Sequence, residues 1–299
     1  MKHVQFAPSP QLSRFETAHR YTIRALAACF SLYVLFETNT LTLPPFQERA
    51  IFLSFALALC FLRPVSQSDG RQRLPFRVVL DFAFAALSIF ACAYIVVDYE
   101  GLINRMGTPT NLDIVMGALG SALVLEATRR LIGWTLPAVA TVFVLYAYYG
   151  AYLPTYLGGH GGYSVSRILT QSFLTMEGIF GLALTVMFTY VFPFVFFGAV
   201  LQSVGALGFA IDLGQAVFGR FRGGPAKVAV VSSGLLGMIN GSAVANVVTG
   251  GSITIPMMKR IGFQPHVAGA IEAVASTGGQ LIPPVMGAAA FIMAELLGV

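Results

Sequence analysis

The chain has 299 residues, of which 56% are hydrophobic and only 10% are charged, and its net charge is +5. Soluble domains carry about 25% charged residues, so this composition excludes a soluble globular protein and indicates a membrane protein. The positive charges lie between apolar runs, as membrane-topology signals do, and therefore do not indicate nucleic-acid binding. Cys29, Cys60 and Cys92 stand singly within apolar runs and predict neither a disulfide framework nor a zinc site.

About six segments are long and apolar enough to cross a membrane, since a spanning helix needs roughly 20 mostly apolar residues. They are residues 21–36, 49–62, 78–97, 112–125, 134–151 and 178–204. The polar start of the chain has no pattern of a cleavable signal peptide, so we expect the first segment to be retained. The sequence therefore predicts an all-α, multi-pass membrane protein.

The positive charges predict its orientation. One set of alternate loops carries most of the lysines and arginines, namely Lys2, Arg14, Arg20, Arg24, Arg63, Arg71, Arg73, Arg77, Arg129, Arg130, Arg220, Arg222 and Lys227. The opposite loops carry only Arg49, Arg105 and Arg167. Because cytoplasmic loops are the ones enriched in Lys and Arg, we predict a bacterial inner-membrane protein with a cytoplasmic N-terminus.

The apolar stretch between Lys227 and Lys259 is too long for one span and too short for two. Both of its ends are cationic, and its middle is Gly241-Ser242-Ala243. This pattern predicts a re-entrant helical hairpin over residues 227–260, entering from the cytoplasmic side with its tip buried in protein or facing a watery cavity. The alternative is a single kinked span, which would place the second cationic end outside.

The last apolar segment, 267–299, contains two interruptions, Ser276-Thr277-Gly278-Gly279 and Pro283-Pro284. Adjacent prolines remove two backbone donors, and glycines lower the cost of unwinding. We therefore predict a broken helix whose interruption lies near the bilayer midplane. Broken helices and hairpins together form the ion and substrate sites of many secondary transporters.

The candidate site combines the hairpin tip with this interruption. Freed backbone carbonyls, hydroxyls and amide oxygens at such points suit Na⁺, and Ser242 and Asn246 are four residues apart, so they would share a helical face. The candidates for ion or substrate binding are Gly241, Ser242, Asn246, Ser276, Thr277, Gly278 and Gly279. The alternative is that these small residues only allow tight helix packing.

Carboxylates within the membrane are costly and usually functional. Glu272 lies one turn before the interruption and is the candidate for a coupling or gating role. Asp81 and Glu126 also lie in or near spans, but arginines at 77, 129 and 130 are close enough in sequence to pair with them. We expect these two carboxylates to form ion pairs near the cytoplasmic surface.

Three stretches carry a family resemblance: GRFRGGPAKVAVVSSGLLG, NGSAVANVVTGGSITIPMMKR and GAIEAVASTGGQLIPPVMGAAAFIMAE. They closely resemble the membrane permease of tripartite ATP-independent periplasmic (TRAP) transporters. The resemblance is greatest to the fused type, in which the small and large membrane subunits form one chain, and LVLEATRRLIGW and TMEGIFG fit the same type. It extends over residues 74–299, whereas the residues before 74 match only in hydropathy.

This resemblance implies an elevator-type secondary transporter, driven by Na⁺, that imports small organic acids delivered by a periplasmic binding protein of the TAXI type. It implies a small-subunit-like scaffold over residues 1–165 and the start of the large transport subunit over residues 166–299. The Na⁺ site of the family's first hairpin maps onto the tip at 241–246 and the interruption at 276–279. The resemblance implies no cofactor, no nucleic-acid partner and no enzymatic activity.

The sequence departs from the family pattern at the tip. Asn240 stands where the family commonly has Ser, and Thr249-Gly250-Gly251 stands where it has a Thr-Thr-Gly run. Only the first of the family's two inverted repeats is present, so we expect the chain as given to be incomplete for transport. The alternatives are an assembly subunit without a transport role, a channel-like pore, and an intramembrane hydrolase with a hairpin serine and His266 as base.

Overall fold

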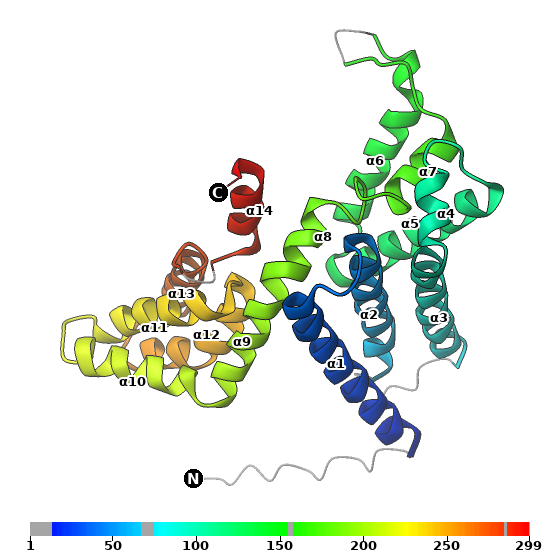
Figure 1. Cartoon of the computed structure of the whole chain (residues 1–299). Coiled ribbons are helices and arrows are strands. Elements are labelled where there is room, and N and C mark those ends of the chain that lie inside the picture. Colours follow the sequence, from blue (N-terminus) through cyan, green and yellow to red (C-terminus); the bar gives the residue numbers. More distant parts are fainter. Residues whose placement is uncertain (1–13, 67–74, 155–157, 284–285, 299) are drawn as a thin grey trace. The chain divides into compact units, whose positions relative to one another are not determined.

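The computed structural model describes residues 14–66, 75–154, 158–283 and 286–298, and within these ranges every regular element is a helix (Figure 1). The chain forms two compact units, with the boundary between Gly181 and Leu182. This boundary follows the loop after α7, which is rich in turns. The all-helical architecture expected from the composition is confirmed.

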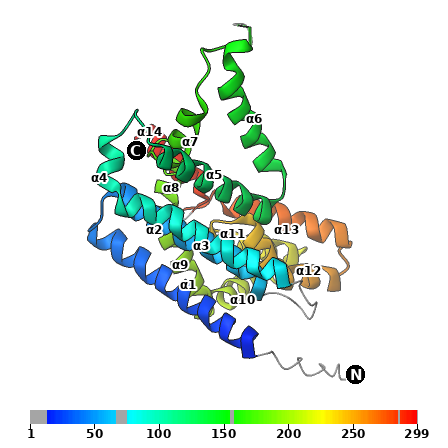
Figure 2. The ribbon, with the colours of Figure 1, turned by 90° about the vertical axis from the view of Figure 1, so that its right-hand side faces the viewer.

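The first unit consists of seven α-helices within the described ranges. They are α1 (Arg14–Thr40), α2 (Pro45–Ser66), α3 (Pro75–Val97), α4 (Tyr99–Asn104), α5 (Asn111–Ile132), α6 (Thr135–Tyr149) and α7 (Val165–Phe173). Helices α2, α3 and α5 pack against one another, and α1, α6 and α7 each pack against a member of this group (Figure 2). Their core contains the fully buried side chains of Phe61, Ile95 and Phe173.

Local signals explain where helix α5 begins and ends. The Thr110 hydroxyl accepts a hydrogen bond from the Asp113 backbone N–H, while the Asp113 carboxylate accepts one from the Thr110 N–H at 2.7 Å. This reciprocal capping box satisfies two N–H groups that have no partner within the helix. Gly133 ends the helix with φ of 94°, a conformation that favours glycine.

The second unit begins with one continuous helix that changes its winding. Helix α8 (Leu182–Val186) leads into a π-helix (Met187–Val191), which leads into α9 (Phe192–Ser203). The Phe291 ring stacks on Tyr190 at 5.7 Å and on Phe194 at 5.5 Å. The remaining helices are α10 (Ala206–Phe218), α11 (Gly224–Asn240), α12 (Ala243–Arg260), α13 (Pro265–Gly279) and α14 (Ala288–Leu297).

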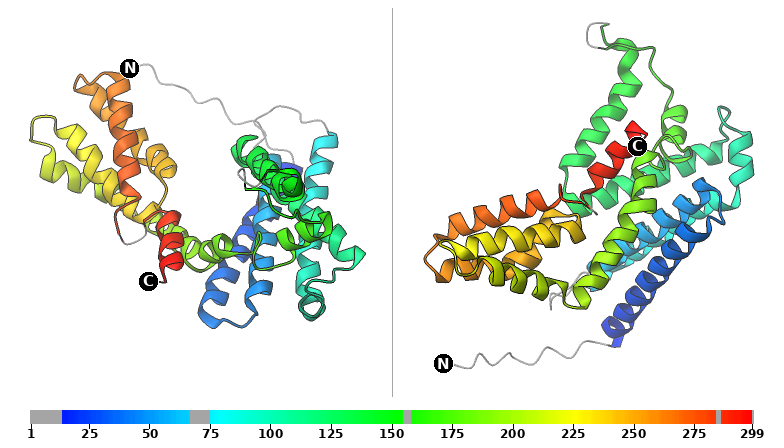
Figure 3. Two further views of the ribbon diagram at one scale, coloured as in Figure 1. Left: turned by 90° about the horizontal axis from the view of Figure 1, so that it is seen from above. Right: turned by 60° about the vertical axis from the view of Figure 1, so that its left-hand side comes forward.

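Helices α11, α12 and α13 form the core of the second unit and lie side by side (Figure 3). Helix α10 packs against the outer side of α11. Ala229, Met258 and Ala268, one from each of the three core helices, are fully buried against one another. The alanines at two of these positions let α11 and α13 come close together, and the Met258 side chain from α12 packs against them.

Five helical segments are long and apolar enough to cross a membrane: Pro45–Leu62, Val78–Val97, Asn111–Ile132, Thr135–Tyr152 and Leu182–Ser203. They confirm five of the six predicted segments. The sixth, 21–36, lies within α1 but is not among these five, because Arg24 within the segment and Arg20 and Glu37 beside it lower the mean hydropathy of the helix.

Candidate ion and substrate site

Helices α11 and α12 are joined by a turn of only two residues, Gly241 and Ser242, and pack along each other. Gly241 has φ of 59°, in the left-handed region where a side chain would be strained. Ser242 is the N-cap of α12, and its hydroxyl accepts a hydrogen bond from the Ala245 N–H at 3.3 Å. The turn at which the sequence predicts a hairpin tip is thus a left-handed glycine followed by a capping serine.

The end of α13 lies against this turn. The Gln280 side-chain amide donates a hydrogen bond to the Gly241 carbonyl at 3.3 Å. A Cβ atom added to Gly237 would lie only 2.4 Å from the Gly279 Cα atom, so the backbones of α11 and α13 are in direct contact there. The structure therefore brings the tip and the end of α13 together.

Of the two predicted interruptions, only the later one lies where the helix is broken. Ser276–Gly279 form the last turn of α13, and the backbone is non-helical at residues 280–283 and 286–287. The small residues stay helical because Gly279 packs against Gly237, and the chain leaves helical geometry only near the adjacent prolines. The expectation that Ser276–Gly279 themselves unwind is wrong.

A cavity of about 410 Å³ opens beside the tip within the second unit. Four helix ends border it: the C-terminal ends of α11 and α13 through Gly241 and Gln280, and the N-terminal ends of α12 and α14 through Ser242 and Ala288. Helix C-termini present unpaired carbonyl oxygens, and helix N-termini present unpaired N–H groups. Apolar side chains complete the wall, namely Met187, Val191, Val195, Met286, Ala289 and Phe291.

Glu272 lies at the centre of a buried polar cluster that connects three helices. Its Oε1 accepts hydrogen bonds from the hydroxyls of Ser233 at 2.7 Å and Ser276 at 3.1 Å, and its Oε2 accepts one from Thr254. The Asn246 side-chain amide donates to the Ser233 carbonyl at 2.7 Å. All five side chains are fully buried, so the cluster ties both arms of the hairpin, α11 and α12, to α13.

The residues predicted for the site separate into three groups. Gly241 and Ser242 line the cavity, whereas Asn246, Ser276 and Gly279 are buried between the helices. We expected Ser242 and Asn246 to share a helical face, and this expectation is wrong. Ser242 is the N-cap that precedes α12, whereas Asn246 lies within the helix and is buried.

The third group consists of Thr277 and Gly278, which do not line the cavity. The Thr277 hydroxyl is exposed and donates to the Ala273 carbonyl of its own helix at 2.8 Å. A Cβ atom added to Gly278 would meet no atom within 4 Å. Neither position supplies an oxygen to the cavity described above.

Sequence reasoning missed Ser233, Thr254 and Gln280. Each is a polar residue within an apolar stretch, and that was the available signal. It was insufficient because hydroxyls in helices commonly bond to their own backbone, as Ser232 does to the Val228 carbonyl at 2.7 Å. Only the packing of three helices shows which hydroxyls face Glu272.

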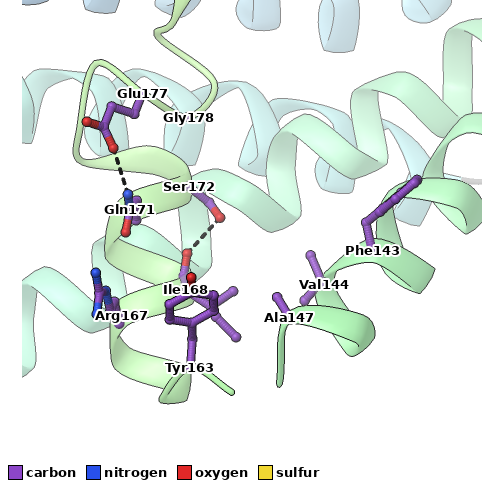
Figure 4. Close-up of a pocket in the computed structure, with 10 residues that line it drawn as sticks. All are labelled: Phe143, Val144, Ala147, Tyr163, Arg167, Ile168, Gln171, Ser172, Glu177 and Gly178. Carbon is purple, nitrogen blue, oxygen red and sulfur yellow. Dashed lines mark hydrogen bonds between the residues drawn. The ribbon is translucent and has the colours of Figure 1, made fainter. Parts of the chain in front are cut away.

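Two further cavities flank α7 in the first unit. One, of about 480 Å³, lies between α6 and α7, and the residues lining it are Phe143, Val144, Ala147, Tyr163, Arg167, Ile168, Gln171, Ser172, Glu177 and Gly178 (Figure 4). The Arg167 guanidinium lies 5.1 Å from the Tyr163 ring centre, and the Gln171 amide donates to Glu177 at 2.7 Å.

The second cavity, of about 700 Å³, lies on the other side of α7 and includes Arg105 and Asp113. The Arg105 guanidinium contacts Asp98 at 2.6 Å and Asp113 at 3.2 Å. These hydrogen bonds raise the pKa of Arg105 above its already high value, so the side chain stays charged at every accessible pH. Arg105 therefore contributes a fixed positive charge at this end of the unit.

Asp81 and Glu126 of the first unit form ion pairs with arginines, as the sequence predicts. Arg130 contacts Asp81 at 2.5 Å and Glu126 at 2.8 Å, and Arg129 contacts Glu126 at 2.7 Å. Asp81 is on α3, whereas the other three residues are on α5, so the network links two helices. The side chain of Arg77, the other predicted partner, lies outside the described part of the structure.

Comparison with protein families matches residues 119–299 to "Tripartite ATP-independent periplasmic transporter, DctM component". An uncharacterized protein of Sinorhizobium fredii is 40% identical over 93 residues, which is 31% of this chain and 22% of that protein. The protein named C4-dicarboxylate TRAP transporter large permease protein DctM is 37% identical over 91 residues in Pseudomonas aeruginosa and 32% identical over 125 residues in Vibrio cholerae. These two matches cover 30% and 42% of this chain. No solved structure matches the chain.

The matched stretches span only 21% to 26% of the length of these curated relatives. The family match itself covers more than half of this chain, from residue 119 in α5 to its end, and includes the tip, the cavity beside it and the Glu272 cluster. The predicted division of roles at residue 166 stays a prediction. This chain is a multi-pass membrane protein that belongs to the family of DctM components of tripartite ATP-independent periplasmic transporters, a family of transporters rather than enzymes.

Proposed function

We propose that this chain is part of the membrane permease of a Na⁺-driven TRAP transporter that imports small organic acids. The observation that carries the proposal is the cavity at which four helix ends meet. In secondary transporters, the N-termini of interrupted helices face anionic substrate groups, while freed carbonyls at C-terminal ends coordinate Na⁺. The ends of α12 and α14 suit a carboxylate, and the ends of α11 and α13 suit Na⁺.

The chemistry of the cavity lining supports an ion and a substrate that neutralise each other. Its lining residues include no charged side chain, and its polar groups are the backbone around Gly241 and Gly287, the Ser242 hydroxyl and the Gln280 amide. An unpaired carboxylate would be costly in such a site, and a bound Na⁺ would offset that cost. The relatives named C4-dicarboxylate transporters make a dicarboxylate the first substrate to test.

The finer features of the proposal follow the resemblance in the sequence. The permease would be of the fused type, elevator-like and located in the bacterial inner membrane, and it would receive substrate from a periplasmic binding protein of the TAXI type. Residues 227–260 would form the first re-entrant hairpin, with the N-terminus of the chain in the cytoplasm. A second repeat outside this sequence would complete the substrate site.

Uptake by the full-length permease tests the proposal. The protein is reconstituted in liposomes with its periplasmic binding protein, and uptake of radiolabelled succinate is measured with and without an inward Na⁺ gradient. We expect uptake that requires both the gradient and the binding protein. Ser242→Ala and Gln280→Ala should each raise the Na⁺ concentration that gives half-maximal uptake, because each removes a polar group at the cavity.

Ser252→Ala is the matched control, because Ser252 is an exposed hydroxyl on the same helix whose oxygen donates to the Thr249 carbonyl. It should leave uptake unchanged. Uptake that is independent of Na⁺ would remove the coupling ion from the proposal. Absence of uptake of any carboxylate, with binding of the periplasmic protein preserved, would favour a non-transporting assembly subunit.

Cysteine labelling tests the hairpin separately. Lys227 and Arg260 are exposed at the outer ends of α11 and α12. Lys227→Cys and Arg260→Cys should both react with a membrane-impermeant maleimide from the cytoplasmic side only. Labelling from opposite sides would show a single span instead of a re-entrant hairpin.

The hydrolase alternative has no support in the geometry. His266 is exposed in the first turn of α13, whereas Ser242 lies at the tip, next to the opposite end of that helix. A base that far from the hydroxyl cannot activate it, since proton transfer needs hydrogen-bond distance.

A further inference from the structure

Glu272 is a buried carboxylate whose hydrogen-bond partners are hydroxyl groups. Within the described residues no Lys, Arg or His forms an ion pair with it, and its partners are Ser233, Thr254 and Ser276. Taking an ionised carboxylate out of water is strongly unfavourable unless a charge compensates it. Hydroxyl donors lower this cost but supply no positive charge.

The charged groups on the surrounding helices do not approach the cluster. Lys227 on α11, Lys259 and Arg260 on α12, and His266 on α13 are all exposed near the ends of these helices that lie away from the tip. Glu272 is the only buried titratable side chain on the three helices in the described part of the chain. A counter-charge for it must therefore arrive as a bound ion or as a proton.

The cluster has fewer hydrogen-bond donors than acceptors. The Thr254 hydroxyl has a single proton, yet two acceptors lie within reach: Glu272 Oε2 and the Gly250 carbonyl, the latter at 3.1 Å. Asn246 Oδ1 is buried and has no hydrogen-bond donor. The cluster therefore contains acceptors that its present donors do not satisfy.

The unsatisfied oxygen and the carboxylate border the same point. A Cβ atom added to Gly250 would lie 3.4 Å from Glu272 Oε1 and 3.8 Å from Asn246 Oδ1. Because Gly250 has no side chain, it places no atom between Glu272 Oε1 and Asn246 Oδ1 at this point. The carboxylate therefore lies beside a second buried acceptor that brings no positive charge.

We propose that Glu272 reversibly binds a proton and that this proton is coupled to movement of the hairpin. In the protonated state the carboxyl group donates from Oε2 to the Thr254 hydroxyl, which in turn donates to the Gly250 carbonyl. In the deprotonated state the Thr254 hydroxyl donates to Oε2 instead. One proton enters or leaves and the charge changes between zero and minus one; the Thr254 hydrogen bond shifts, but no covalent bond other than the O–H bond of the carboxyl group forms or breaks.

The connections of Glu272 explain why this proton would matter for transport. Ser233 is on α11 and Thr254 is on α12, so the carboxylate holds both arms of the hairpin, and Asn246 joins the cluster one turn below the tip. A change of charge at Glu272 therefore changes the energy of moving the hairpin relative to α13. The link to uptake rests on the proposed function, but the protonation itself does not.

Infrared spectroscopy tests the protonation without any substrate. The purified full-length protein in lipid is titrated with acid, and the C=O stretching band of protonated carboxyl groups is recorded in H₂O and D₂O. We expect a band that grows on acidification, exchanges slowly with deuterium because the group is buried, and disappears in Glu272→Gln. Glu295→Gln, which changes an exposed carboxylate on α14, is the matched control and should keep the band.

Thr254→Val keeps the carboxylate and changes only the hydroxyl that serves both states. We expect the band to remain but to titrate at a different pH, because the variant removes the group that donates to one state and accepts from the other. An unchanged titration would overturn the role of Thr254. An unchanged band in Glu272→Gln, or a Glu272 band that is insensitive to pH, would overturn the proposal as a whole.

The coupling is tested by succinate uptake driven by an inward pH gradient. The wild type should respond to the gradient, and Glu272→Gln should lose this response while it still binds the periplasmic protein. A titrating band without uptake would leave the proton site standing and remove the proposed function. Uptake without a titrating band would support the proposed function and overturn the proton site at Glu272.

Discussion

Three carboxylates of the first unit and Glu272 of the second unit are held in different ways. In the first unit, arginines lie within 3.2 Å of Asp81, Glu126 and Asp113. The buried Glu37 of that unit instead accepts hydrogen bonds from the Thr42 hydroxyl and the Leu43 N–H. In the second unit, Glu272 is surrounded by hydroxyls and tightly packed glycines. An ion pair holds two helices together and keeps the carboxylate charged. Neutral hydroxyl donors can bond to a carboxylate in either its charged or its protonated form. We therefore expect the ion-paired helices α3 and α5 to resist movement more than the helices around Glu272.

Removal of Arg130 should have the largest effect, because it breaks the rigid side of this comparison. Arg130 links α5 to α3 through Asp81, and its guanidinium lies 5.0 Å from the Phe61 ring centre. Breaking a buried pair costs about 3–5 kcal/mol, and Arg130→Met should fall at the lower end because Glu126 keeps its contact with Arg129. Thermal unfolding in detergent measures the loss. Arg129→Met, which is more exposed, is the control and should cost about 1 kcal/mol or less.

Gly237→Ala breaks the tight packing on the other side of the comparison. The new Cβ would lie 2.4 Å from the Gly279 Cα atom and 2.9 Å from its carbonyl oxygen, so α11 and α13 must move apart. Overpacking of this kind costs about 1–3 kcal/mol. Gly278→Ala is the matched control, because its Cβ would meet no atom within 4 Å, and it should not destabilise the protein. Equal unfolding temperatures for the two variants would contradict the backbone contact.

The sequence alone predicts most helix positions but not the contacts between helices, as Gly237 shows. Apolar length located five of the spanning helices, and the glycine and serine at the tip located the turn between α11 and α12. The end of α13 was placed too early, because glycines favour unwinding only when nothing holds them, and Gly279 is held by Gly237. A contact across 42 positions of sequence cannot be inferred from the local pattern of either helix.

Thr110→Ala should lower the stability less than the variants above. It weakens the start of α5 without removing a charge, so it separates the contribution of helix capping from that of the ion pairs. Thr110 caps α5 through its bonds with Asp113, and loss of a threonine cap costs about 1 kcal/mol. Hydrogen–deuterium exchange should show faster exchange confined to the first turn of α5. Thr141→Ala is the control, because the Thr141 hydroxyl donates only to the Pro137 carbonyl of its own helix at 2.8 Å.

Arg167→Ala should have the smallest effect. The exposed guanidinium lies 5.1 Å from the Tyr163 ring centre, and an exposed cation–π contact contributes about 0.5–1 kcal/mol. The unfolding temperature in detergent should therefore fall only slightly, and by a similar amount in Tyr163→Leu. A loss as large as that in Arg130→Met would mean that the first unit depends on its surface charges and not mainly on its buried pairs.

The π-helix Met187–Val191 contains one residue more than an α-helical turn would hold, between two α-helices of ordinary winding. Successive residues of an α-helix are about 100° apart around its axis, so a return of this turn to α geometry would rotate α9 by that angle relative to α8. Phe194 would then turn away from the Phe291 ring on which it now stacks, and Val195 would leave the cavity wall. A change of winding in this one turn would therefore replace the side chains that a solute in the cavity would meet.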